Sequence, residues 1–340
     1  MKVLAARALP RLLVPALLAA GIAVPYVLRS YAVSLISLAF IAALLAASVN
    51  MLAGQMHLVS VGHAGIAASA SYAVAWAHNH GHGYGAQLAL AALLTLAVSV
   101  VYALTSMRTS GIFFLMVTLA LGMVVFGLAY RMSQVTGGEN GLSGMRRPPM
   151  FAETWKFYYL TLAALVLAVA ALWVVTRSPF GLVLRGIRDS ETRMTSLGYS
   201  VPAYKFAAIL MSGAVAGLAG VMAVWHAEFV SPSSAGFLRS ALTVIMVILG
   251  GVGTILGPIL GAGIVIWTEN VLSTYVERWP TVLGLIFIVV VLFAPKGIVG
   301  ALQDLVARRR AARRRTTDKA SDDETGTTEA PVPSSTPSGS

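Results

Sequence analysis

The stretch YAVSLISLAFIAALLAASVNML, residues 31–52, decides the class of fold. It contains no Asp, Glu, Lys or Arg, so no charged side chain opposes its transfer into lipid. An unbroken apolar run of about 20 residues is long enough to cross the hydrocarbon core of a bilayer as an α-helix. A membrane β-strand would be shorter and would alternate apolar with polar residues, which this stretch does not do. The sequence therefore predicts a membrane-spanning helix here.

The composition extends this interpretation to the whole chain. Of its 340 residues, 57% are hydrophobic and 11% are charged, whereas soluble domains carry roughly 25% charged residues. A soluble domain of this length could not hide so much apolar surface. We therefore expect an all-α, polytopic transmembrane bundle. Its ten predicted membrane segments are residues 10–28, 31–52, 55–77, 86–107, 111–130, 157–176, 206–226, 240–251, 255–276 and 280–295.

Two of these segments are unusual. The eighth, 240–251, is rich in glycine and too short to span a bilayer alone. We expect a broken or re-entrant helix, which is tolerated where protein or a cavity surrounds it. The first, 10–28, resembles a signal peptide, because its apolar stretch from Leu12 to Leu28 follows Lys2, Arg7 and Arg11. Its apolar run is longer than the ~7–15 residues typical of such peptides, so we expect it to be retained as a span.

The positions of Lys and Arg predict the orientation. If both termini are cytoplasmic and the spans alternate, most of these residues fall on the inner side, chiefly in 177–205 and 296–319. Inner loops of membrane proteins carry this excess. The net charge of +11 therefore reflects topology, and no nucleic-acid partner is expected. We predict a multi-pass membrane protein with a transmembrane domain over 1–300.

The remaining 301–340 form the predicted tail. Its first part is basic and is expected to lie against anionic lipid headgroups. Its last part, 316–340, is rich in Ser, Thr, Pro and acidic residues, a composition typical of disorder.

Several chemistries are not expected. The sequence has no cysteine, which excludes disulfides and thiolate metal sites. The HNHGHG turn, 78–83, offers histidines without a carboxylate, whereas zinc takes three or four ligands, so we predict no metal site. The glycine run 250–261 lacks the Lys-Ser/Thr pair of a phosphate-binding loop. The few acids lie at helix ends or in the tail, so we do not expect an enzyme.

The hydrophilic loop RSPFGLVLRGIRDSETRMTSLGYSVPAYK, 177–205, is the most informative segment. Pro179 suits a first helical position, and Phe180, Leu184 and Ile187 would form one apolar face. Asp189 or Ser190 can cap a second helix, Glu191 favours its first turn, and Gly198 suits the position that ends it. The loop therefore predicts two short helices on the cytoplasmic face. They could be a docking element for a soluble partner or simply a solvated basic loop.

This loop resembles the cytoplasmic coupling segment of LivM-type branched-chain amino acid permeases. The matching positions are Ser178, Pro179, Phe180, Gly181, Arg185, Ile187, Arg188, Glu191, Leu197, Gly198, Tyr204 and Lys205. Further resemblance lies in NMLAGQMHLVSVGHAGIAASASY (50–72), GIFFLMVTLALG (111–122), TGGENGLSG (136–144), GGVGTILGPILGA (250–262) and LFAPKGI (292–298). Together these stretches cover most of residues 50–298.

The resemblance implies that the loop contacts an ATPase. The residues expected to couple to it are Phe180, Gly181, Arg185, Arg188, Asp189, Glu191 and Gly198. The loop 131–156 would lie outside, where a solute-binding protein docks, and the residues expected to meet it are Thr136, Gly137, Gly138 and Asn140. A plain surface turn is the alternative.

The candidate pathway or gating residues are Asn50, Gln55, Gly62, His63, Gly253 and Gly257. Polar groups at membrane depth must find partners and often line a pathway. The alternative is structural: His63 would bond within the bundle while Gly62 and Gly65 allow close packing. Gly253, Gly257 and Gly261 have the four-residue spacing of one helix face, as do Gly213 and Gly217. That pattern is typical of close helix packing, which either stays fixed or moves during gating.

The function implied is the permease subunit of an ATP-binding-cassette importer for branched-chain amino acids. Its partners would be a companion permease of LivH type, two cytoplasmic ATPases of LivG and LivF type, an extracytoplasmic solute-binding protein and membrane lipid. ATP and Mg²⁺ would be bound by the ATPases, so this chain would need no cofactor of its own. Alternatives are a substrate such as urea, an amide or another amino acid, an ion-coupled secondary transporter, and a non-transporting scaffold.

Overall fold

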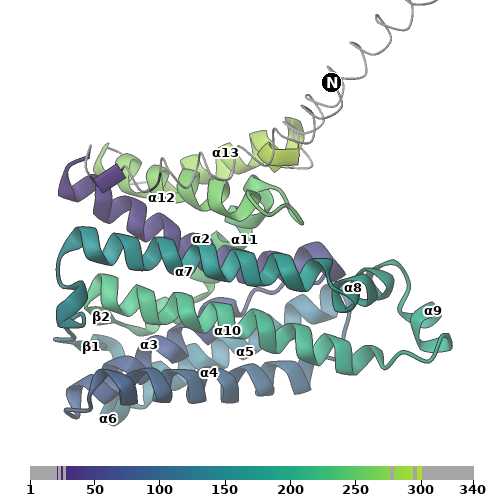
Figure 1. Cartoon of the computed structure of the whole chain (residues 1–340), viewed down its shortest axis with the longest axis horizontal. Helices are drawn as coiled ribbons and strands as arrows, with labels where there is room; N and C mark the ends of the chain where they lie inside the picture. The colour runs from purple at the N-terminus through teal and green to yellow at the C-terminus, as the bar shows by residue number, and fades with distance from the viewer. Residues whose placement is uncertain (1–20, 22–23, 26–27, 276–278, 294–296, 301–340) are drawn as a thin grey trace, which may run out of the picture.

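The chain folds into a bundle of helices that run side by side (Figure 1). The computed structural model describes residues 21, 24–25, 28–275, 279–293 and 297–300. Its longer helices are α2 (Ser30–Met56), α3 (His63–Asn79), α4 (Tyr84–Ser106), α5 (Gly111–Arg131), α7 (Thr154–Arg177), α10 (Val201–Ala227), α11 (Phe237–Gly250), α12 (Gly257–Tyr275) and α13 (Trp279–Phe293). These confirm nine of the ten predicted segments as helices, and the first lies almost wholly outside the described residues.

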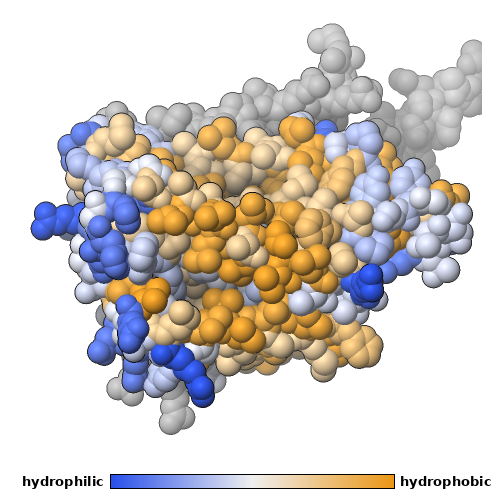
Figure 2. Space-filling view, turned by 90° about the horizontal axis from the view of Figure 1, so that it is seen from below, coloured by the Kyte–Doolittle hydropathy of each residue, from blue (hydrophilic) through white to orange (hydrophobic). Residues whose placement is uncertain are grey.

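The helices present an apolar band between two polar ends. Figure 2 shows hydrophobic side chains across the middle of one face and hydrophilic ones toward both ends. In the described part of the chain, α2, α4, α5, α7 and α10 are long and apolar enough to cross a membrane. Leu93, Phe113 and Leu167 are more than 60% exposed on the outer sides of three of these helices. Such side chains are stable when lipid covers them.

The core forms around α2 and α3. Helix α2 packs against α7, α10, α11 and α12, and α3 packs against α4 and α10. Small side chains such as Ala46 on α2 and Ala70 on α3 are fully buried, which lets the helix backbones come close. The more exposed helices α4, α5 and α7 surround this centre and carry the lipid-facing leucines.

Short elements mark the two ends of the bundle (Figure 1). At one end lie α6 (Ser133–Thr136), the 3₁₀ turns Gly138–Asn140, Pro149–Phe151 and Pro232–Ala235, and two strands, β1 (Leu142–Ser143) and β2 (Phe229–Val230). We call this the sheet end, because β1 and β2 pair antiparallel there, with Leu142 opposite Val230. The expectation of an all-α chain missed this small sheet. At the other end, the insert end, lie α8 (Pro179–Asp189) and α9 (Glu191–Ser196).

The third predicted segment was wrong at its start. A helix was expected from residue 55, but α2 continues to Met56, His57 turns left-handed at φ 55°, and α3 begins only at His63. The backbone between them is held by the side chains of neighbouring helices. Val61 N–H donates to Thr118 Oγ1 at 3.3 Å, and Tyr102 OH donates to the Gly62 carbonyl at 3.1 Å.

The eighth segment is broken, as predicted. Helix α11 has 14 residues, or about 21 Å at 1.5 Å per residue, against roughly 30 Å of bilayer hydrocarbon. Gly251 and Gly253 follow it at φ 117° and 78°, values that side chains other than glycine rarely adopt. The prediction that Gly253 shares a helix face with Gly257 and Gly261 is therefore wrong, because Gly253 lies in the break. We call residues 251–256 the α11–α12 break.

Candidate functional site: the insert end and the helix break

The two predicted short helices of the loop 177–205 are both present. Pro179 is the first residue of α8, and Ser190 caps α9 by accepting a hydrogen bond from Arg193 N–H at 3.2 Å. Gly198 follows α9 at φ 88°, as expected for the residue that ends it. We call α8 and α9 together the helical insert.

The helical insert is fastened to the bundle by one apolar face. Leu184 and Ile187 are buried, and the half-buried Phe180 stacks on Tyr204 of α10 with ring centroids 5.5 Å apart. A side chain at Gly181 would put its Cβ 2.3 Å from the Thr176 carbonyl oxygen, so only glycine permits the tight turn from α7 into α8. Leu182 of α8 is exposed, as are Leu197 and Tyr199 in the turn that follows α9.

An ion pair joins α9 to the body of the bundle. Lys205 on α10 is 1% exposed, and its Nζ lies 2.6 Å from Glu191 Oε1. The same ammonium donates to the carbonyl oxygen of Thr109, between α4 and α5, at 2.9 Å. The buried Lys205 charge therefore connects the insert to α10 and to the connection between α4 and α5. Arg188 and Asp189 pair with each other at the surface, at 3.1 Å.

A second link runs from α8 to α2. Arg185 Nη1 donates to Gln55 Oε1 at 3.0 Å and to the Thr176 carbonyl oxygen at 2.8 Å. A residue expected to couple to an ATPase thus touches a residue expected to line a pathway. The sequence did not predict this contact, because 130 residues separate the two.

The α11–α12 break is held against α2. Asn50 Nδ2 donates to the Thr254 carbonyl oxygen at 2.9 Å, and Asn50 Oδ1 accepts from Gly253 N–H at 2.8 Å. Gly54 and Gly253 touch backbone to backbone, since a Cβ on Gly54 would lie 2.5 Å from Gly253 Cα. Asn50 therefore supplies the partners that the interrupted helix lacks.

These contacts surround a cavity of about 220 Å³ at the insert end. Its wall brings together four residues that the sequence analysis selected separately: Asn50, Gln55, Arg185 and Gly253. Trp173, Thr176 and Arg177 complete its polar side. We call this the insert-end cavity.

Gly62 and His63 lie apart from that cavity, in the core. His63 Nε2 is 2.7 Å from Ser212 Oγ, and its Nδ1 is 2.7 Å from Ser60 Oγ. Ser212 donates its own proton to the Ser48 carbonyl oxygen, so it accepts from His63 Nε2–H, and Nδ1 accepts from Ser60. A side chain at Gly62 would meet the Thr118 carbonyl oxygen at 2.2 Å. In this conformation both residues tie helices together.

The other glycine pairs pack as predicted. A Cβ on Gly257 or Gly261 of α12 would lie within about 3 Å of the backbone of Gly250 or Met246, respectively. Gly213 and Gly217 of α10 face Ser99 and Thr95 of α4.

The loop at the sheet end is folded rather than open. Thr136 Oγ1 donates to the carbonyl oxygens of Ala129 and Met132, at 2.6 and 2.8 Å. Gly137 and Gly138 adopt φ of 74° and 59°, and Asn140 is exposed. Of the four predicted docking residues, Asn140 is the one that is freely accessible.

Arg147 fixes this loop to α10, which the sequence analysis missed. Its Nε and Nη2 donate to the carbonyl oxygens of Trp225 and His226, at 2.7 and 3.0 Å. The guanidinium also lies over the Phe157 ring, 4.5 Å from the centroid. Arg147 therefore caps the last turn of α10, where carbonyl groups have no partner within the helix.

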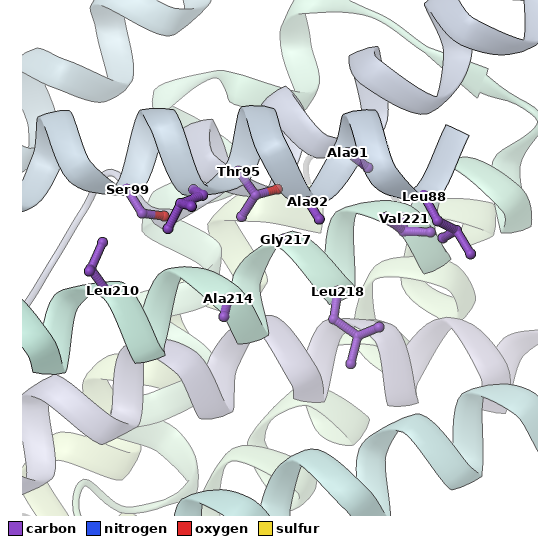
Figure 3. A pocket seen from close by; sticks show the side chains of 11 residues that line it. Leu88, Ala91, Ala92, Thr95, Ser99, Leu210, Ala214, Gly217, Leu218 and Val221 are labelled. Carbon is purple, nitrogen blue, oxygen red and sulfur yellow. The ribbon is translucent and has the colours of Figure 1, made fainter. Parts of the chain in front are cut away.

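A larger cavity, of about 410 Å³, lies between α4 and α10. Figure 3 shows its lining, which is aliphatic apart from Thr95 and Ser99. None of the predicted pathway residues belongs to it. This lining suits hydrocarbon better than a charged solute.

Membrane-length apolar helices with a folded insert at one polar end define a multi-spanning membrane protein. The sequence profile described as branched-chain amino acid transport system, permease component, matches residues 31–294. The chain belongs to this family, whose members are transport components and not enzymes.

Two similar proteins are permeases of the same class. The high-affinity branched-chain amino acid transport system permease proteins LivM of Salmonella typhimurium and of Escherichia coli are each 28% identical to this chain over 317 residues. The match covers 85% of this chain and 75% of each relative. A solved structure of an inward-facing, putative metal-chelate type ABC transporter is 16% identical, covering 77% of this chain and 82% of that one, with a TM-score of 0.44.

Proposed function

We propose that this chain is the permease subunit of an ATP-driven importer of branched-chain amino acids in the bacterial inner membrane. The observation that carries the proposal is the family match over residues 31–294, which spans α2 to α13 and includes the helical insert. The two named relatives are permeases for the same class of solute. ATP and Mg²⁺ would be held by partner subunits, and this chain would bind neither.

The orientation proposed places the insert end in the cytoplasm and the sheet end outside. Arg177, Arg185, Arg188 and Arg193 gather at the insert end, and inner surfaces carry the excess of positive charge. With the first segment, 10–28, and both parts of the broken pair counted, the chain would cross ten times, with both termini inside. The tail 301–340 and the end of domain 1–300 would then also be cytoplasmic.

The partners proposed are two ATPases of LivG and LivF type, a companion permease of LivH type and an extracytoplasmic solute-binding protein. The ATPases would dock at the insert end, where Leu182 on α8 and Leu197 and Tyr199 just after α9 are exposed beside charged residues. Apolar groups exposed on a polar end are typical of an interaction surface. The binding protein would dock at the sheet end, around Asn140.

The mechanism proposed is alternating access driven by movement of the insert. A push on α9 would reach α10 and the α4–α5 connection through Lys205. A push on α8 would reach α2 through Arg185 and Gln55, and α2 holds the α11–α12 break through Asn50. Gly54, Gly253 and Gly257 would be the packing points that shift.

The test is uptake of labelled leucine into liposomes that hold the chain with its four proposed partners. We expect uptake that requires ATP and the binding protein, and little uptake of urea. Uptake by the chain alone under a proton or sodium gradient would instead identify an ion-coupled transporter.

A labelling experiment tests the orientation separately. The natural chain has no cysteine, so a single introduced thiol is a unique target. We expect an impermeant maleimide to label Asn140→Cys in intact cells and Thr192→Cys only after lysis. Both positions are exposed, so labelling of Thr192→Cys from outside would overturn the orientation.

A further inference from the structure

We infer that the insert-end cavity binds a phosphate-bearing anion, the headgroup of an anionic lipid. This goes beyond the transport function and depends only on these helix ends lying at a membrane surface. Arg177 and Arg185 both line the cavity, one from the end of α7 and one from α8. Among the described residues, neither forms an ion pair with an acid.

Arg185 is half-buried and has unused donors. Its hydrogen bonds to the described residues both leave from Nη1, toward Gln55 and the Thr176 carbonyl, which are neutral groups. A guanidinium carries five N–H donors in a fork that matches phosphate. A half-buried charge with neutral partners is stabilised by an anion that enters its cavity.

The outer side of the cavity has the features of the lipid interface. Trp173 is 40% exposed, and the Arg177 guanidinium lies over its ring, 4.4 Å from the centroid. Tryptophan and arginine at the end of an apolar helix lie at headgroup depth. Basic pockets between membrane helices on the cytoplasmic side are suited to anionic headgroups.

The neutral groups in the wall also suit a phosphate. The Gln55 side-chain amide accepts from Arg185 through Oε1, and its Nε2 donates to none of the described residues. No Asp or Glu contributes to the lining. A bound headgroup would connect α2, α7 and α8 at the point where the insert meets the bundle.

The test is native mass spectrometry of the full-length chain in detergent with equal amounts of phosphatidylglycerol and phosphatidylcholine. We expect phosphatidylglycerol to be retained preferentially. Arg177→Gln and Arg185→Gln should each lower that preference about fivefold, the equivalent of about 1 kcal/mol for one charge near a membrane surface. Arg193→Gln is the matched control, because this arginine is exposed on α9 and does not line the cavity.

A thermal-shift series separates the two sources of phosphate. If short-chain phosphatidylglycerol stabilises the wild type and inorganic phosphate does not, the ligand is a lipid headgroup. If inorganic phosphate stabilises the wild type but not Arg177→Gln, the site holds soluble anion and the lipid assignment fails. Equal phosphatidylglycerol retention by wild type and by both variants would overturn the anion site. Circular dichroism confirms that each variant is folded, and leucine uptake is measured separately, so failure here leaves the transport proposal standing.

Discussion

Lys205 and Glu191 form a contact of 2.6 Å in which one partner is almost fully buried and the other is 41% exposed. The pair joins the outermost helix of the insert to α10. A buried charge at the end of an apolar helix bundle is stable only if it has hydrogen-bond partners. The Lys205 ammonium has two, the Glu191 carboxylate and the Thr109 carbonyl oxygen.

Glu191→Gln should therefore destabilise the folded chain. The substitution replaces the carboxylate with a neutral amide oxygen, so the buried ammonium loses its counter-charge, and we expect a loss of about 1–3 kcal/mol in the free energy of unfolding. Because Glu191 is partly exposed, the lower half of that range is expected. The measurement is thermal unfolding in detergent, with leucine-stimulated ATPase activity of the assembled transporter as the readout of coupling. Glu153→Gln, which breaks an exposed pair with Lys156 at the sheet end, is the control and should change either value little.

Gly54→Ala should disturb the α11–α12 break. The new Cβ would lie 2.5 Å from Gly253 Cα, a backbone atom that cannot rotate away. Overpacking of this kind destabilises by about 1–3 kcal/mol. Gly127→Ala on α5 adds the same methyl group where no atom lies within 4 Å, and should be neutral or slightly stabilising. Equal melting temperatures for the two variants would show that the Gly54–Gly253 contact is not tight.

Asn50→Ala removes both side-chain bonds to the break. Gly253 N–H and the Thr254 carbonyl would lose their partners, which we expect to lower stability by about 1–3 kcal/mol and to slow leucine uptake. Asn50→Asp keeps an acceptor for Gly253 N–H and, as the protonated acid, also offers a donor to the Thr254 carbonyl oxygen, so its effect on unfolding should be smaller than that of Asn50→Ala. Asn270→Ala, which removes a bond within α12 alone, is the matched control.

Ser212→Ala tests the structural role of His63. The imidazole Nε2–H would lose its acceptor in the core, with an expected loss of about 1–3 kcal/mol. Ser69→Ala removes a hydroxyl whose bond is local to α3, so it should lose less than about 1 kcal/mol. Leucine uptake per folded molecule should be unchanged in Ser212→Ala if His63 only ties helices together. If Ser212→Ala lost leucine uptake while keeping the stability of the wild type, His63 would be assigned to the transport pathway.

Arg147→Gln should loosen the sheet end. It removes two charge-assisted hydrogen bonds to α10 and the contact with the Phe157 ring. We expect faster hydrogen exchange in residues 132–153 and weaker binding of the solute-binding protein. Arg146→Gln changes the neighbouring, exposed arginine and should leave exchange unaltered.

Hydropathy predicted the helices well because the length of an apolar run directly reflects the thickness of lipid. It failed at residues 57–62, where Leu58 and Val61 look helical but their backbone is held by Thr118 and Tyr102 from other helices. The glycine spacing misplaced Gly253, because a four-residue spacing looks the same in a helix and in a break. The ends of helices in the insert depend on neighbouring residues in the sequence. The roles of Pro179, Ser190 and Gly198 at those ends were therefore predicted correctly.

The site was predictable as a set of residues and not as an arrangement. Asn50, Gln55, Arg185 and Gly253 were selected from separate segments, and only the fold brings them to one cavity. Lys205 was noted as part of a motif, yet its partners Glu191 and Thr109 cannot be inferred from spacing. The sequence analysis did not select Arg147, because nothing local shows that it caps a helix formed by residues 201–227.

The fastening of the sheet end affects how a partner would associate with it. The segment from Ser133 to Phe151 is pinned through Leu142 to Val230 and through Arg147 to the final turn of α10. A protein arriving there meets a surface that is already shaped, so little chain entropy is lost on contact. Its arrival rate would then be governed mainly by diffusion and by long-range charge.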